Sequence, residues 1–119
     1  MLKLEEVYVV EGKHAAGEMG SGDLEVLATP ALIAFMENAA KEEVLGQLAD
    51  GETSVGIELS VQHLKATAIG QTVRVQSRLV EQKKSILFYE LETYEGETLI
   101  GKGTHKRAIV DAQKFMDSL

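Results

Sequence analysis

The sequence predicts an α+β domain in which one long helix lies on one face of an antiparallel sheet. Apolar residues recur at helical spacing from residue 29 to about residue 48. After Gly51 they recur at every second position instead, which is typical of strands. One long helix followed by several strands is the pattern of α+β folds, because the apolar stripe of the helix has to be buried against the sheet.

The helix carries recognisable signals at both ends. Thr29 followed by Pro30 predicts the N-terminus, with the threonine hydroxyl as N-cap and the proline at the first helical position, where no N–H is needed. Asp50-Gly51 predicts the end of the helix shortly after Leu48.

The remaining segments predict short strands around this helix. Before it, residues 5–10 form a short strand, and residues 11–23, with four glycines and no apolar periodicity, form a loop. After it, alternating apolar residues predict a half-buried strand that comprises Val55, Ile57, Leu59 and Val61. Three further strands are expected at 72–80, 86–94 and 99–110, separated by turns at 81–84 and Glu95-Gly96, and together the strands predict an antiparallel meander.

Composition and charge exclude several classes of protein. A chain of 119 residues with one proline suits a single globular domain, which we take to span residues 1–119. The absence of cysteine excludes disulfides, a thiolate nucleophile and cysteine-based metal sites. A net charge of −7 argues against a nucleic-acid partner. The N-terminus lacks the basic flank of a signal peptide, and no apolar run approaches the roughly 20 residues of a membrane span, so we expect a cytoplasmic protein with no membrane partner.

Glu37 lies where a charge is unexpected. At about 100° per residue it projects about 40° from Ile33, which we take as the middle of the apolar stripe, whereas Glu42 and Glu43 project toward or near the polar flank. A carboxylate that faces a core is costly unless it is paired or neutral. Two interpretations are open: Glu37 lies at the edge of the stripe and pairs with Lys41, or it is a buried catalytic acid or base.

His63 is predicted to face the same layer as Glu37. It continues the alternation of Val55, Ile57, Leu59 and Val61, so its side chain points toward the face that the helix covers. A histidine in such a place is commonly a hydrogen-bonded packing residue. Beside an inward carboxylate, however, it has what a general base needs.

Thr29 is the third candidate. It projects on the same side of the helix as Ile33, at the end where free backbone N–H groups converge, although a plain N-cap would explain it equally well. Thr29 and Glu37 are eight residues apart, about 12 Å along the helix axis, so they cannot touch. A histidine could bridge them, within one chain or across a dimer interface.

Other site motifs are weak or missing. His14 and His105 are too far apart in sequence to form a short metal-binding motif with His63, and no P-loop, GxGxxG or GxSxG motif occurs. We therefore expect neither a metal nor a cofactor.

Three segments, in order, resemble one family. LATPALIAFME, SVGIELSVQHLKAT and GKGTHKRAIVDAQKF are similar to segments of the hot-dog-fold thioesterases related to fluoroacetyl-CoA thioesterase, and the resemblance runs from about Gly22 to Phe115. It implies a long central helix wrapped by a curved antiparallel sheet. It also implies homodimers in which two sheets pair and active sites form at the interface.

The resemblance also implies roles for five residues. Thr29, Glu37 and His63 match the family residues that serve acyl-CoA hydrolysis, Gly56 matches a glycine that lines the site, and Arg107 matches an arginine of the substrate-binding region. We therefore expect hydrolysis of a small acyl-CoA, in which helix N-terminal N–H groups polarise the carbonyl and His63 activates Thr29 or a water.

The acyl group and two other functions stay open. Tyr8 is the one aromatic residue before Phe35, apart from histidine, so a gating aromatic in the loop before the helix has no obvious counterpart. A non-catalytic acyl-CoA binding or sensing module and a hot-dog hydratase or dehydratase would suit the same fold. Because the protein is acidic, CoA would have to be bound by local bases, for which the candidates are Lys65, Lys83, Lys84, Lys106 and Arg107.

Overall fold

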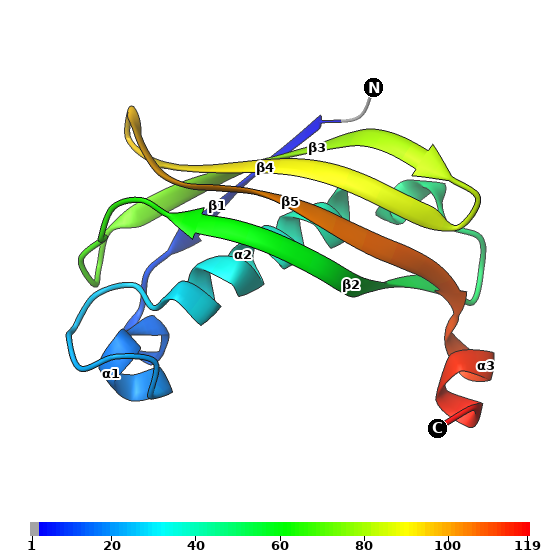
Figure 1. Cartoon of the computed structure of the whole chain (residues 1–119), viewed down its shortest axis with the longest axis horizontal. Helices are drawn as coiled ribbons and strands as arrows, with labels where there is room; N and C mark the ends of the chain where they lie inside the picture. Colours follow the sequence, from blue (N-terminus) through cyan, green and yellow to red (C-terminus); the bar gives the residue numbers. More distant parts are fainter. Residues whose placement is uncertain (1–2) are drawn as a thin grey trace.

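A curved, five-stranded antiparallel sheet wraps around one long helix (Figure 1). The structure is a computed structural model and describes residues 3–119. Its elements are, in order, β1 (Lys3–Val9), η1 (Gly12–His14), α1 (Ala16–Met19), α2 (Thr29–Glu43), η2 (Leu45–Gln47), β2 (Glu52–His63), β3 (Thr72–Lys83), β4 (Ile86–Glu95), β5 (Thr98–Asp111) and α3 (Ala112–Asp117). The predicted α+β class is confirmed.

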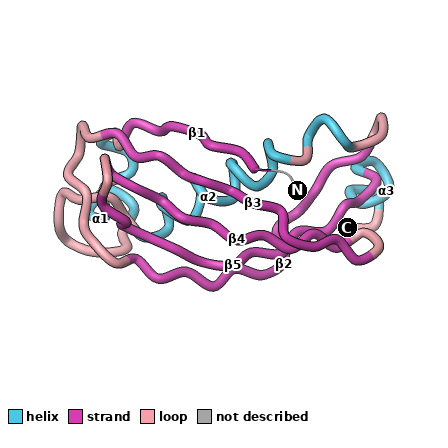
Figure 2. Tube along the Cα trace, turned by 90° about the horizontal axis from the view of Figure 1, so that it is seen from above, coloured by secondary structure: helices cyan, strands magenta, loops and turns pink. Residues whose placement is uncertain are grey.

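The strands lie side by side in the order β1-β3-β4-β5-β2 (Figure 2). β3, β4 and β5 form the expected meander, but β2 does not join it, because it pairs with β5 at the far edge. The segment after β2 runs back across the end of the sheet, where the N–H groups of Leu64 and Lys65 donate to the carbonyl of Ile100. Pairing of β1 with β3 leaves β1 and β2 as the two edges of the sheet.

The concave face of the sheet and one face of α2 form the core. The buried residues of the helix are Ala31, Leu32, Phe35, Met36, Ala39 and Ala40. Ile33 is only partly buried, so the centre of the stripe lies between Leu32 and Met36 and not at Ile33. Measured from that centre, Glu37 projects about 120° away, at the edge of the stripe. Our placement of Glu37 on the stripe itself is therefore wrong.

A register shift between Gly56 and Glu58 changes which residues of β2 face the helix. Leu59 and Val61 pack against the core as expected, but Ile57 is 52% exposed. The predicted buried face is therefore wrong for Val55 and Ile57. A bulge adds one residue to the strand, so that on its N-terminal side Ser54 and Gly56 turn inward instead.

Three local expectations need smaller corrections. The segment expected to be a loop contains η1 and α1. The helix ends at Glu43 and continues only as a 3-10 turn, five residues short of Leu48. A further short helix, α3, was not predicted; its first turn is capped by the carboxylate of Asp111, 2.9 Å from the N–H of Lys114.

Gly101 on β5 lets α2 approach the sheet closely. A Cβ at this position would lie 2.8 Å from Cδ2 of Leu32 and 3.5 Å from Cε of Met36. Close packing leaves no room for that methyl group unless Leu32 moves.

Replacing Gly101 by alanine should lower the free energy of unfolding by about 1–3 kcal/mol, because the added methyl group overpacks the contact between helix and sheet. Urea denaturation measures this change. Gly12→Ala is the matched control, since nothing lies within 4 Å of the added carbon there. Similar losses in the two variants would mean that the close approach at Gly101 is unimportant.

Candidate active site

Thr29 and His63 meet at the N-terminal end of α2. Thr29 is the first residue of the helix, and its Oγ1 lies 2.8 Å from Nδ1 of His63, the last residue of β2. The N-cap position belongs to Ala28, and no side chain caps this end of the helix. The interpretation of Thr29 as a plain N-cap is therefore wrong, and its hydroxyl is engaged by the histidine.

The second ring nitrogen of His63 has no hydrogen-bond partner among the described residues. Nε2 is buried and makes no hydrogen bond to any of residues 3–119. Burial lowers the pKa of His63, an effect that the backbone of Lys65 opposes, so the imidazole is neutral at pH 7. A neutral ring that accepts the Thr29 proton at Nδ1 carries its own proton on Nε2, and that proton still needs an acceptor.

A pocket of about 300 Å³ opens beside this threonine–histidine pair. Its walls come from α1, the segment before α2, the first turn of α2 and the residues after β2, and its lining residues include no phenylalanine, tyrosine or tryptophan. Because Ala28 and Thr29 line it, the pocket lies at the end of α2 where the first backbone N–H groups have no partner within the helix. These groups and the helix dipole favour a negative charge in the pocket.

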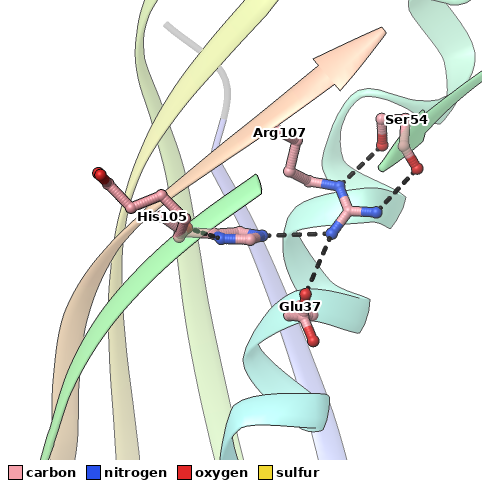
Figure 3. A network of polar contacts seen from close by, with 5 residues as sticks. Glu37, Ser54, His105 and Arg107 are labelled. Atoms are coloured by element: carbon pink, nitrogen blue, oxygen red, sulfur yellow. Dashed lines mark hydrogen bonds and ion pairs between the residues drawn. The ribbon is translucent and has the colours of Figure 1, made fainter. Parts of the chain in front are cut away.

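Glu37 lies two turns farther along α2, beside Arg107 of β5 (Figure 3). Its Oε2 is 3.8 Å from Nη1 of Arg107, and its side chain is 42% exposed. Lys41 pairs with Glu42 instead, at 3.3 Å. The interpretation that Glu37 lies at the edge of the stripe is therefore confirmed, but the expected pairing with Lys41 is wrong.

Arg107 is buried and held by several neighbours (Figure 3). Its Nε donates to Oγ of Ser54 at 2.8 Å, its Nη2 donates to the Ser54 carbonyl at 2.9 Å, and its Nη1 lies 3.2 Å from Nε2 of His105. Burial lowers the pKa of Arg107, and the charge of Glu37 opposes this effect. Arg107 is only 6% exposed and has little surface for the phosphates of CoA, while its contact with another part of the substrate stays a prediction.

Gly56 completes this second group, which we call the glutamate–arginine cluster (Glu37, Ser54, Gly56, His105 and Arg107). A Cβ on Gly56 would lie 2.5 Å from Oε2 of Glu37 and 3.4 Å from Nη1 of Arg107. Any residue larger than glycine at position 56 would displace the carboxylate of Glu37. The bulge in β2 turns this glycine inward, toward the cluster.

The two groups are separate within one chain. Glu37 contacts Arg107, whereas His63 contacts Thr29, and no contact joins Glu37 to His63 among the described residues. The separation is about 12 Å along α2 and about 20 Å along β2. His63 therefore does not bridge Thr29 and Glu37 within a single chain.

The sequence analysis missed Ser54 and His105. Ser54 lies just before the first residue of the predicted alternation, and the bulge in β2 that turns it inward leaves no clear mark in the hydrophobic pattern. His105 was weighed only as a metal ligand. Its spacing from Arg107 was an available signal, since residues two apart on a strand share a face.

The candidate CoA-binding bases differ in their surroundings. Lys83 pairs with Glu81 at 3.6 Å, and Lys106 pairs with Glu58 at 3.2 Å. Lys65 alone of the five candidates lines the pocket beside Thr29 and His63. A groove of about 360 Å³ on the opposite, outer face of the sheet is lined by none of the candidate catalytic residues.

Two features are absent from residues 3–119. None of their helices has the length and apolar character that a membrane span requires. Nor do three or more histidine, aspartate or glutamate side chains lie together in a way that could hold a metal ion.

Replacing Thr29 by alanine should lower the free energy of unfolding by less than about 0.5 kcal/mol, because the hydroxyl caps no helix, whereas loss of an N-cap typically costs about 1 kcal/mol. Chemical denaturation of the two proteins measures the difference. Asp111→Ala serves as control, because it removes the cap that the structure does contain. A larger loss for Thr29→Ala than for Asp111→Ala would restore the N-cap interpretation.

Comparisons with known proteins agree with this fold. The sequence profile of the family described as fluoroacetyl-CoA-specific thioesterase matches residues 10–113. The fluoroacetyl-CoA thioesterase of Streptantibioticus cattleyicolor is 35% identical over 91 residues, which are 76% of this chain and 66% of the length of that enzyme.

Solved structures show the same architecture. A variant of the fluoroacetyl-CoA-specific thioesterase FlK, in complex with fluoroacetate and CoA, is 28% identical with a TM-score of 0.90, covering 95% of each chain. A hot-dog-like protein from Thermanaerovibrio acidaminovorans, at 17% identity, shares the fold with a TM-score of 0.88 over 98% of this chain and 86% of that one. The fold is thus the hot-dog fold, and because the family profile covers most of its length, the chain belongs to the fluoroacetyl-CoA-specific thioesterase family.

Proposed function

We propose that the protein hydrolyses the thioester bond of a small acyl-CoA, as a cytoplasmic homodimer in which residues 1–119 form one thioesterase domain. The main support is the 2.8 Å contact between Oγ1 of Thr29 and Nδ1 of His63 beside a pocket at the start of α2. The membership of the chain in its family and the binding of CoA by the FlK variant add to this support.

In the proposed reaction, His63 acts as the general base. Its neutral ring takes a proton from Thr29, whose oxygen attacks the thioester carbonyl, or from a water that attacks directly. Backbone N–H groups at the start of α2 stabilise the oxyanion. The C–S bond then breaks, and the imidazolium returns the proton to the sulfur of CoA. If Thr29 attacks, a water activated in the same way hydrolyses the acyl-threonine ester.

The proposed dimer joins the two separated groups. β2 is an edge strand of 12 residues, and a long unpaired edge favours pairing with a second copy. We place the two-fold axis at Ser60, which pairs Leu59 with Val61 of the partner subunit and brings the two groups together. Ile57 is the extra residue of the bulge and has no opposite residue. Beyond it, the same register places His63 opposite Gly56 of the partner subunit.

This pairing supplies the acceptor that His63 lacks. Gly56 lies against the carboxylate of Glu37. Glu37 of the partner subunit then approaches Nε2 of His63, accepts its hydrogen bond and stabilises the imidazolium. Lys65, at the edge of the pocket, is the candidate base for an anionic group of CoA.

We expect release of free thiol from a panel of short acyl-CoA esters, measured with a thiol-reactive dye. The value of kcat/KM should rise with pH through the apparent pKa of His63, because the ring is a base only when it is neutral. Burial lowers this pKa in the single chain, and the carboxylate of Glu37 of the partner subunit opposes that effect in the dimer. His63→Ala should remove this limb and lower kcat by about 10²-fold or more.

The other functions give different results in the same assays. Saturable binding without thiol release would favour a sensing module, and hydration of an enoyl-CoA would favour a hydratase. A flat pH profile with full activity in His63→Ala would exclude His63 as the base.

Mixing two inactive variants should restore activity if the site is shared between subunits. A dimer of one Thr29→Ala chain and one Glu37→Gln chain contains one site with intact Thr29 and His63 from one chain and intact Glu37 from the other. Unfolding and refolding the two variants together at equal amounts should give about a quarter of wild-type turnover, since half of the dimers are mixed and each has one of two sites intact.

A mixture of Thr29→Ala with His63→Ala is the matched control. These two residues belong to the same half of the site, so every site in the mixed dimer lacks one of them and turnover should stay low. Failure of the first mixture to gain activity, with mixed dimers shown by native mass spectrometry, would mean that each site lies within one chain.

A further inference from the structure

We infer that His105 is a positioning residue of the thioesterase site: its Nε2 accepts a hydrogen bond from Arg107 and so holds the guanidinium against Glu37. This inference rests on the proposed function, because it requires the carboxylate of Glu37 to work in turnover. It assigns a role to a histidine that contacts neither Thr29 nor His63 in the chain.

The contacts of His105 fix its ring in one tautomer. The side chain is 2% exposed, and its Nδ1 lies 2.8 Å from the carbonyl oxygen of Glu58. A carbonyl can only accept, so Nδ1 carries the proton. A guanidinium can only donate, so the contact of 3.2 Å between Nη1 of Arg107 and Nε2 of His105 requires a free lone pair on Nε2. Both contacts are satisfied by the same neutral ring.

The surroundings keep this ring neutral. Burial lowers the pKa of His105, and the positive charge of Arg107 lowers it further, whereas the Glu58 carbonyl and the charge of Glu37 act in the opposite direction. A protonated ring would also direct an N–H group at the N–H of Arg107, which would break the contact.

His105 completes the set of contacts that orients Arg107. Ser54 accepts from Nε and Nη2 along one edge of the guanidinium, and His105 accepts from Nη1. With these positions fixed, Nη1 also faces Oε2 of Glu37 at 3.8 Å, which is an ion pair without a short hydrogen bond. The ion pair with Arg107 thus holds the carboxylate in place, while its oxygens can still accept a hydrogen bond from another donor.

Two substitutions separate the contacts of His105. Asparagine can keep a donor near the Glu58 carbonyl but has no acceptor that reaches Arg107, whereas the longer glutamine can place its oxygen near the position of Nε2. We expect His105→Asn to lower kcat by about 10-fold to 10²-fold with little change in KM, since a misplaced catalytic group acts on the chemical step. His105→Gln should recover most of that loss.

The role through Glu37 is tested in a double-mutant cycle. In a Glu37→Gln background, His105→Asn should cause no further loss of kcat, because the carboxylate that it positions is already gone. An equal loss in both backgrounds would overturn the inference. So would a His105→Asn protein that loses thermal stability while kcat of the folded fraction stays at the wild-type value.

A readout independent of turnover separates this inference from the proposed function. Nitrogen-15 NMR of the wild-type histidine rings should show His105 as the neutral tautomer protonated on Nδ1 from pH 5.5 to 8. A ring protonated on Nε2, or one that titrates at the ordinary histidine value, would overturn the assignment. Absence of thiol release in the wild-type protein would instead count against the thioesterase function.

Discussion

The burial of one guanidinium charge determines how half of the candidate site is built. A charged group removed from water is costly unless it is paired and hydrogen-bonded, and Arg107 meets both conditions through Ser54, His105 and Glu37. These partners come from β2, β5 and α2, so the pairing of the strands and the position of the helix are tied to the same charge. The missing side chain at Gly56 follows from it as well, because the carboxylate that faces Arg107 occupies that space.

Local patterns predicted one group of the site and not the other. The alternation of Leu59 and Val61 and the start of α2 correctly brought Thr29 and His63 into one layer, because both signals depend on a few adjacent residues. The family resemblance singled out Gly56 and Arg107. The ionic partner of Glu37 could not be predicted from spacing, because Arg107 lies 70 residues away in sequence and reaches the helix only after β5 has paired with β2. The reversed faces of Val55 and Ile57 had a related cause, since an inserted residue on a strand leaves no periodic signal.

The threonine–histidine pair and the glutamate–arginine cluster each lack a part that the proposed chemistry needs. The threonine–histidine pair contains a base whose buried Nε2 has no partner among the described residues, and the glutamate–arginine cluster contains a carboxylate that is half open to solvent. Both groups include residues of β2, one of the two edge strands of the sheet. An unsatisfied buried nitrogen is uncommon in a stable protein, and this is why the proposed function assigns an acceptor to it.

The bulge in β2 has a mechanical consequence for an assembly built on this edge. Two regular strands can slide past each other by one residue with little change in their backbone hydrogen bonds, although every side chain then changes face. Two strands that each carry a bulge at a fixed position have fewer equivalent registers, because each bulge must lie opposite a segment of the partner strand that can accommodate it. The bulge would then fix the register of the two paired β2 strands. A shift of one residue, too small to separate the two subunits, would still move the catalytic side chains of one subunit away from those of the other.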